Sequence, residues 1–158
     1  MPLVLRKSGP ADREAISRFL EERWGSTRIA LRGRLVDAAD LPGITTDPVG
    51  LGLATYDVEA GELLSLDAVT PGRGIGTALV EAVAAELRQA DHAVMRVTTT
   101  NDNLDALRFY QRRGFRIAAI RPDAVDAARR LKPTIPLEGH FGIPIRDEIE
   151  LFLKLAKG

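Results

Sequence analysis

The hydrophobic positions along the chain change their spacing several times, and these changes predict alternating strands and helices. Alternating or short continuous apolar runs are typical of strands, whereas apolar residues three and four apart are typical of amphipathic helices. We expect strands over residues 3–6, 49–56, 62–69, 93–98, 115–120 and 148–155, and helices over residues 11–22, 77–89 and 124–131. Residues 33–41 alternate weakly, and Pro42-Gly43 predicts a turn. The chain is thus β-rich first, βαβα at its centre, and closed by a strand.

A further helix is expected between a cluster of polar residues and a glycine. Asn101, Asp102 and Asn103 are each candidate N-caps, and Gly114 is a natural helix end. Residues 121–147 differ in composition from the rest of the chain: they contain four prolines, a short basic helical stretch and a turn-rich segment. A long insertion of this kind is usually functional or mobile.

Length and composition narrow the class of protein. At 158 residues the chain is long enough for one domain with a full core, so we expect a single domain over residues 1–158. Acidic and basic residues balance at 22 each, which favours neither nucleic acid nor a membrane surface as a partner. With no cysteine and only two histidines, we expect no disulfide and no metal site. The absence of a signal-like or membrane-spanning apolar run makes a soluble cytoplasmic protein the default expectation.

A glycine-rich turn joins an apolar strand to a long helix. In the run from Val69 to Leu79, three glycines lie two residues apart, at Gly72, Gly74 and Gly76. Glycine allows positive φ and leaves the backbone N–H groups accessible to an anion. The helix N-terminus directs its own amides to the same place. The turn therefore predicts a phosphate cradle, although an ordinary strand-to-helix turn that binds nothing would have the same residues.

A second motif decides between these interpretations. Downstream of the glycine turn, Asn103, Ala106, Tyr110, Gly114 and Phe115 follow at the intervals Asn-x-x-Ala-x-x-x-Tyr-x-x-x-Gly-Phe. Together with the glycine turn, this pattern resembles the GNAT superfamily of N-acetyltransferases. The resemblance covers residues 62–120 well and the N-terminal third only by the order of elements.

The resemblance implies an α/β fold with a twisted mixed sheet, flanked by helices and split into a V between its fourth and fifth strands, where acyl-CoA lies. It places the pyrophosphate on Arg73, Gly74, Ile75, Gly76 and Thr77, and the pantetheine arm along the backbone of Leu66, Ala68 and Val69. Pro71 departs from the family pattern, which has Arg or Gln there. Arg73 could compensate by direct charge pairing, or it could simply be solvated.

Tyr110 matches the family tyrosine that acts as a general acid. Acyl transfer from a thioester expels a thiolate, and a phenol with a pKa near 10 is protonated at pH 7. Packing of Phe109 and Tyr110 against the sheet is the alternative interpretation. The resemblance implies that Asn103 contacts the pantetheine arm, whereas its position also suits a helix N-cap.

The general base has several candidates. Asp67 is the first, because it lies late on the strand beside the acyl group and points opposite Leu66 and Ala68. Glu62 and His140 are weaker candidates. Asp147 and Glu148 could bind a cationic acceptor, pair with Arg146 or be solvated, and Trp24 could line the acceptor pocket or anchor a lid or core.

The sequence therefore predicts an N-acetyltransferase that moves an acetyl group from acetyl-CoA to a primary amine of a small molecule or protein. Direct transfer fits the absence of cysteine. A catalytically silent acyl-CoA-binding regulatory module and a plain phosphate-binding domain are the alternatives. We expect the acceptor to be selected by residues 24–34 and by the insertion at 121–147. Family members often pair through edge or C-terminal strands, so a homodimer is one expected assembly.

Overall fold

The computed structural model describes residues 3–47, 49–70 and 72–156. The chain divides into two compact units. Unit 1 contains residues 1–28, 37–95 and 155–158, and unit 2 contains residues 29–36 and 96–154. The unusual Pro71 lies outside the described residues.

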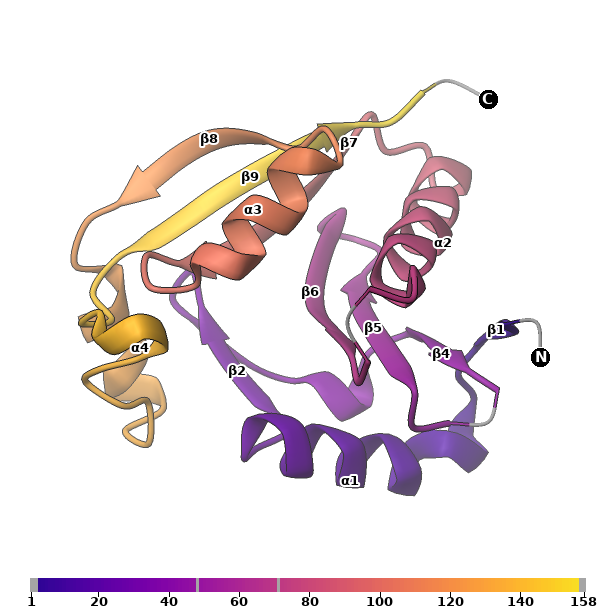
Figure 1. Ribbon diagram of the computed structural model, residues 1–158, viewed down its shortest axis with the longest axis horizontal. Coiled ribbons are helices and arrows are strands. Elements are labelled where there is room, and N and C mark those ends of the chain that lie inside the picture. The colour runs from indigo at the N-terminus through magenta and orange to yellow at the C-terminus, as the bar shows by residue number, and fades with distance from the viewer. Residues whose placement is uncertain (1–2, 48, 71, 157–158) are drawn as a thin grey trace. The chain divides into compact units, whose positions relative to one another are not determined.

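Unit 1 is built on antiparallel strands in the order β1-β4-β5-β6. The strands are β1 (Leu5–Lys7), β4 (Gly43–Thr46), β5 (Gly52–Asp57) and β6 (Glu62–Ala68). The helices are η1 (Pro10–Asp12), α1 (Arg13–Trp24), η2 (Ala38–Asp40) and α2 (Ile75–Gln89). Figure 1 shows α2 lying along β5 and β6, which it contacts.

The core of unit 1 follows the predicted apolar face of α2. Leu79, Val83 and Leu87 are completely buried, as their four-residue spacing predicts. Gly52 lets this helix approach β5, because a β-carbon there would lie 2.7 Å from the side chain of Ile75. Gly52 is thus required for the close packing of the helix that follows the glycine turn.

Unit 2 contains strands in the order β7-β9-β8 together with most of a separate β2-β3 hairpin. The strands are β2 (Arg28–Leu31), β3 (Arg34–Asp37), β7 (Val94–Thr100), β8 (Arg116–Arg121) and β9 (Glu148–Lys154). The helices are α3 (Leu104–Arg112), α4 (Ala124–Leu131) and η3 (His140–Gly142). β8 and β9 pair antiparallel, with Arg121 opposite Glu148.

Most predicted elements are confirmed, including the α/β class and the short helix at 124–131. One prediction at the N-terminal side is wrong, and strands β2 and β4 were not predicted. Gly43 begins strand β4 instead of completing a turn. All four residues of β4 are buried, so the strand shows no polar alternation, and two of them are threonines. The expected strand at 49–56 begins only at Gly52.

Other predictions concern the whole chain. The opening of the sheet between its fourth and fifth strands depends on the placement of the two units and stays a prediction, as do the single domain and the role of residues 121–147. Among the helices of the described ranges, none has the length and apolar character needed to cross a membrane.

Candidate functional site

The glycine turn forms the N-terminus of α2 as the sequence suggests. Gly72 and Gly74 have φ values of 81° and 75°, and Gly74 is the N-cap of α2. The helix starts at Ile75, two residues earlier than predicted, and Ala78 N–H donates to the Gly74 carbonyl at 3.0 Å. The amides of Ile75 and Gly76 precede this bond, at positions where a helix has no carbonyl four residues back to accept them. The predicted phosphate-binding residues 73–77 therefore lie together at one helix N-terminus.

The space in front of this turn is open. A β-carbon placed at Gly72 or Gly74 would have no heavy atom within 4 Å outside its immediate chain. Arg73, between them, is exposed. Positive φ at both glycines and the missing β-carbons leave the backbone accessible to an anion.

Strand β6 offers backbone groups along one edge. Val69 N–H donates to the Leu51 carbonyl at 2.9 Å, so the groups of Val69 point to β5. Hydrogen-bonding direction alternates along an antiparallel strand. Leu66 and Ala68, which lie opposite Ala54 and Gly52, therefore present their N–H and C=O groups to the edge away from β5. Leu66 and Ala68 thus direct their backbone groups away from β5, as a pantetheine contact needs, whereas the Val69 amide is used within the sheet.

Asp67 is held by the end of α1. Its carboxylate accepts two hydrogen bonds from the Arg23 guanidinium, at 2.8 and 2.9 Å, and one from Trp24 Nε1 at 3.1 Å. The hydrogen bond with Asp67 also raises the pKa of Arg23. Trp24 remains 41% exposed, so it is not a core residue. Oδ2 accepts two of these hydrogen bonds and Oδ1 accepts one, so Oδ1 keeps one acceptor position for a proton.

A cavity of about 350 Å³ lies beside Asp67's partners in unit 1. It is lined by α1, by the turn before β5 and by Val69 at the end of β6. Arg18, Arg23 and Glu22 contribute its charges.

Asn103 is the N-cap of α3. Its Oδ1 accepts the Ala106 amide at 3.1 Å, which is the predicted capping interaction. The contact between Asn103 and the pantetheine arm stays a prediction.

Tyr110 is almost completely buried in unit 2, with 7% of its surface exposed. Its ring lies 5.4 Å from that of Phe109 and 5.1 Å from that of Phe115. Burial raises the pKa of the phenol well above its ordinary value near 10. The hydroxyl is therefore protonated throughout the neutral range, as a proton or hydrogen-bond donor must be.

The weaker base candidates lie in different surroundings. Glu62 is fully buried at the start of β6, whereas His140 in η3 is exposed. Asp147 Oδ1 accepts the Asp123 amide. Glu148 is neither solvated nor paired with Arg146: it is 3% exposed and pairs with Arg121 at 3.1 Å.

Sequence reasoning missed two groups of residues in unit 2. Asn101 and Asp102, expected only as candidate caps, hold residues 139–147 to the end of β7. Asn101 Oδ1 accepts the amides of Arg146 and Asp147, and Asp102 accepts the His140 amide. A charged cluster also forms around Glu148. The alternation Glu-Ile-Glu at 148–150 puts both carboxylates on one face of β9 and could have indicated it.

Within the described ranges, no group of three or more metal-ligating side chains comes together.

Comparison with known proteins identifies the family. A model of the Acetyltransferase (GNAT) family matches residues 47–115, which include both sequence motifs. The uncharacterized protein YxbD of Bacillus subtilis (strain 168) is 38% identical over 148 residues, covering 90% of this chain and 93% of YxbD. YdhI of the same organism is 37% identical over 158 residues, covering 97% and 98%. The chain belongs to the GNAT acetyltransferase family.

Solved structures show the same fold. An IAA acetyltransferase from Bacillus cereus superposes on this GNAT chain with a TM-score of 0.70 at 21% identity, covering 98% of this chain and all of that one. The acetyltransferase yncA from Salmonella typhimurium, solved with acetyl-CoA, has a TM-score of 0.65 at 19% identity, covering 100% and 96%. A Bacillus subtilis acetyltransferase in complex with CoA has a TM-score of 0.66 at 18% identity, covering 98% and 100%.

Proposed function

We propose that this GNAT acetyltransferase moves an acetyl group from acetyl-CoA directly to a primary amine of a small molecule or protein. The open glycine turn at the N-terminus of α2 carries the proposal. Gly72 and Gly74 hold positive φ there, and a β-carbon on either would project into the open space. Such a turn fits the pyrophosphate of CoA, because anions bind the unpaired amides of a helix N-terminus.

Acetyl-CoA is the proposed donor substrate. Residues 73–77 would hold its pyrophosphate, and the outward backbone groups of Leu66 and Ala68 would pair with its pantetheine arm. Structural relatives solved with acetyl-CoA or CoA support this choice. Asn103 keeps its proposed pantetheine contact through the side-chain NH₂, since its Oδ1 caps α3.

Tyr110 is the proposed acid. Attack of an amine on the thioester carbonyl forms the new C–N bond, and breaking the C–S bond releases a thiolate that needs a proton. A buried phenol whose pKa is raised stays protonated and can donate to the sulfur. The role requires that the sulfur of CoA reach a hydroxyl that is buried in the protein alone.

Asp67 remains the proposed base. The amine acceptor arrives largely as an ammonium ion and must lose a proton before attack. The proton would pass to Asp67 Oδ1, which accepts a single hydrogen bond, from Arg23. The chain has no cysteine that could carry the acetyl group, which fits direct transfer. It also has no disulfide that would need an oxidising compartment, and we include a cytoplasmic location in the proposal. A homodimer is part of the same proposal.

A thiol-release assay tests this function. The protein is incubated with acetyl-CoA and a broad panel of primary amines, and free CoA is measured together with the mass of each acceptor. We expect CoA release that depends on the amine and matches the acetylated product. Tight binding of acetyl-CoA without release for any amine would identify a silent binding module, and equal binding of ADP and CoA would identify a plain phosphate-binding domain.

A further inference from the structure

The last turn of α1 carries the chain's only tryptophan beside the proposed base. Trp24 is the last residue of the helix, and its indole Nε1 donates to Asp67 Oδ2 at 3.1 Å. Asp67 lies on β6 between Leu66 and Ala68, whose backbone groups are proposed for the donor. The hydrogen bond therefore fixes one edge of the indole next to the residues proposed for acetyl transfer, all within unit 1.

The faces of this indole are not used by the described part of the protein. Trp24 is 41% exposed, although tryptophan is a largely buried residue on average. Among the described residues, no aromatic ring and no cationic group stacks on Trp24, whereas the Arg113 guanidinium lies 3.6 Å from the ring centre of Phe109. An indole with a fixed edge and an open face is a preformed platform for a cation.

The charge beside Trp24 favours a cation as the ligand of this platform. Residues three apart on a helix are neighbours on its surface, so Glu21 lies on the same side of α1 as Trp24. Glu21 is exposed, and its carboxylate has no hydrogen bond or ion pair with the described residues. It also lies at the C-terminal end of the helix, where the macrodipole disfavours a negative charge. A cation placed between Glu21 and the indole would offset that unfavourable charge.

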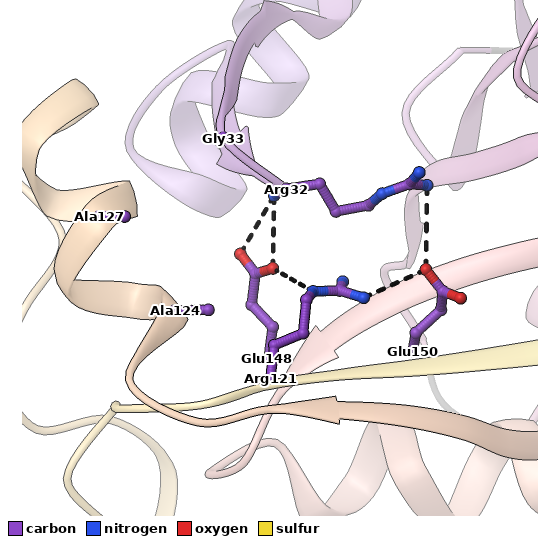
Figure 2. Close-up of a pocket in the computed structure, with 7 residues that line it drawn as sticks. All are labelled: Arg32, Gly33, Arg121, Ala124, Ala127, Glu148 and Glu150. Atoms are coloured by element: carbon purple, nitrogen blue, oxygen red, sulfur yellow. Dashed lines mark hydrogen bonds and ion pairs between the residues drawn. The ribbon is translucent and has the colours of Figure 1, made fainter.

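The charged cavity of unit 2 shows the opposite situation. It is lined by the β2-β3 hairpin, β8, β9 and α4, and its charged residues are Arg32, Arg121, Glu148 and Glu150. Figure 2 shows these side chains directed toward one another, with Arg121 bridging Glu148 at 3.1 Å and Glu150 at 3.3 Å. The carboxylates of that cavity are paired within the protein, whereas the carboxylate of Glu21 is available to a ligand.

We infer that the acceptor is an amine with a second, cationic group, and that this group binds the face of Trp24 beside Glu21. The amine that is acetylated would lie at Asp67 Oδ1, which keeps an acceptor position for its proton. The indole connects the two places, because its Nε1 edge contacts Asp67. This inference rests on the proposed function, since it specifies the class of amine that is acetylated.

The test compares two amines of the same shape with the full-length protein. One is an aminoalkyl trimethylammonium, and the other has an uncharged tert-butyl group in place of the trimethylammonium; each is made in a series of chain lengths. Transfer is measured as kcat/KM by CoA release, and binding is followed by the fluorescence of the single tryptophan. We expect the cation to be preferred by about 5-fold at the best chain length, as a cation–π contact at a partly exposed ring provides.

Two substitutions of Trp24 isolate the aromatic face. Trp24→Phe and Trp24→Leu both lose the hydrogen bond to Asp67, but only phenylalanine keeps a ring. We expect Trp24→Leu to lower the ratio of cation to neutral amine by about 5-fold, and Trp24→Phe by about 2-fold because tryptophan binds cations best. The ratio is taken within one variant, so it does not depend on the fraction of folded protein.

Glu21 is tested on the same two amines. Glu21→Gln should lower kcat/KM for the cation by about 2-fold, the usual order of an exposed ion pair, and leave the neutral amine unchanged. Glu14→Gln, in the first turn of the same helix, is the matched control and should change neither. Equal effects of the two glutamate substitutions would contradict a cation bound beside Glu21.

The outcomes separate this inference from the proposed function. Amine-dependent CoA release with no preference for the cation, or with a preference that Trp24→Leu leaves intact, would overturn the cation site and leave the acetyltransferase standing. Equal losses in Trp24→Phe and Trp24→Leu would also overturn the site, because the indole would then act only through Asp67. Preferential, saturable binding of the cation at Trp24 without transfer to any amine would support the site and overturn the proposed function. Unchanged fluorescence with the cation at every chain length would overturn the site, whether or not CoA is released.

Discussion

The two units differ in the kind of group that they contribute: backbone groups for the donor in unit 1 and side chains in unit 2. The unit 1 residues proposed for the donor contribute backbone groups of β6 and of the N-terminus of α2, where Gly72 and Gly74 have no side chain. In unit 2, the charged cavity consists of side chains from a hairpin, two strands and a helix that are far apart in sequence. A backbone site depends on local conformation, whereas a side-chain site depends on the identity of each residue.

Removing the hydroxyl of Tyr110 should give the largest effect. We expect Tyr110→Phe to lower kcat by about 100-fold, the usual contribution of a general acid, with little change in the Kd for acetyl-CoA. The control is Tyr56→Phe, because Tyr56 is also buried in a site that raises its pKa but has no proposed role. The kcat of each variant is measured by steady-state kinetics at a saturating concentration of the amine acceptor. Equal losses in the two variants would mean that Tyr110 serves packing only.

Asp67 gives a comparable test of the base. We expect Asp67→Asn to lower kcat by about 100-fold, because the carboxylate that takes the proton from the amine substrate would be missing. Arg23→Gln releases the carboxylate from its ion pair and should leave most of the turnover. If the two variants lose the same amount, the Arg23–Asp67 contact is an anchor for α1 and another group is the base.

A side chain at Gly74 should damage the donor site more than the fold. Gly74→Ala places a β-carbon in the open turn and strains a residue with φ of 75°, and we expect acetyl-CoA to bind about 10-fold more weakly. Gly25→Ala imposes similar strain at the end of α1, where φ is 79° and the surrounding space is also open. Both variants should lose about 1–2 kcal/mol of unfolding free energy. Calorimetric titration distinguishes them, and equal affinities would exclude a backbone cradle.

Smaller effects are expected on the free energy of unfolding, first at acid pH. Hydrogen bonds from the Arg6 side chain and the Gly9 amide hold the pKa of Asp12 well below its ordinary value near 4. A lowered native pKa means that the unfolded chain binds the proton first as pH falls. This stabilisation is complete above about pH 4 and is lost below it. Chemical unfolding of Asp12→Asn should therefore show lower stability at pH 7 and a flatter curve below pH 4, and a curve parallel to wild type would contradict it.

Alkaline pH probes unit 2 through the same linkage. Burial raises the pKa of Tyr110 above its unfolded value, so its contribution is complete below about pH 10 and falls as pH rises beyond it. Tyr110→Phe should remove that part of the alkaline loss. A loss unchanged in the variant would show that the phenol does not ionise from a buried state.

How much the sequence predicts also differs between the units. The glycine turn, α2 and β6 follow from local rules, because glycine, helix spacing and strand alternation act over a few residues. The fully buried β4 was missed because it lacks polar alternation, which is the signal that sequence reasoning uses. Asp67 and Glu148 were recognised as chemical groups, but their partners Arg23 and Arg121 are distant in sequence or lie on another strand. Pairing across elements is decided by tertiary structure, so it could not be assigned beforehand.

A single-turnover experiment with acetyl-CoA labelled in its acetyl group tests the central claim most directly. Enzyme in excess is mixed with labelled acetyl-CoA and an amine that the enzyme acetylates. The label is then followed in the protein, in the product and in unreacted acetyl-CoA. The account predicts that label passes from donor to amine with one CoA released per product and with no labelled protein at any time. Label that accumulates on the protein before product forms, or CoA release without an acetylated amine, would contradict direct acetyl transfer.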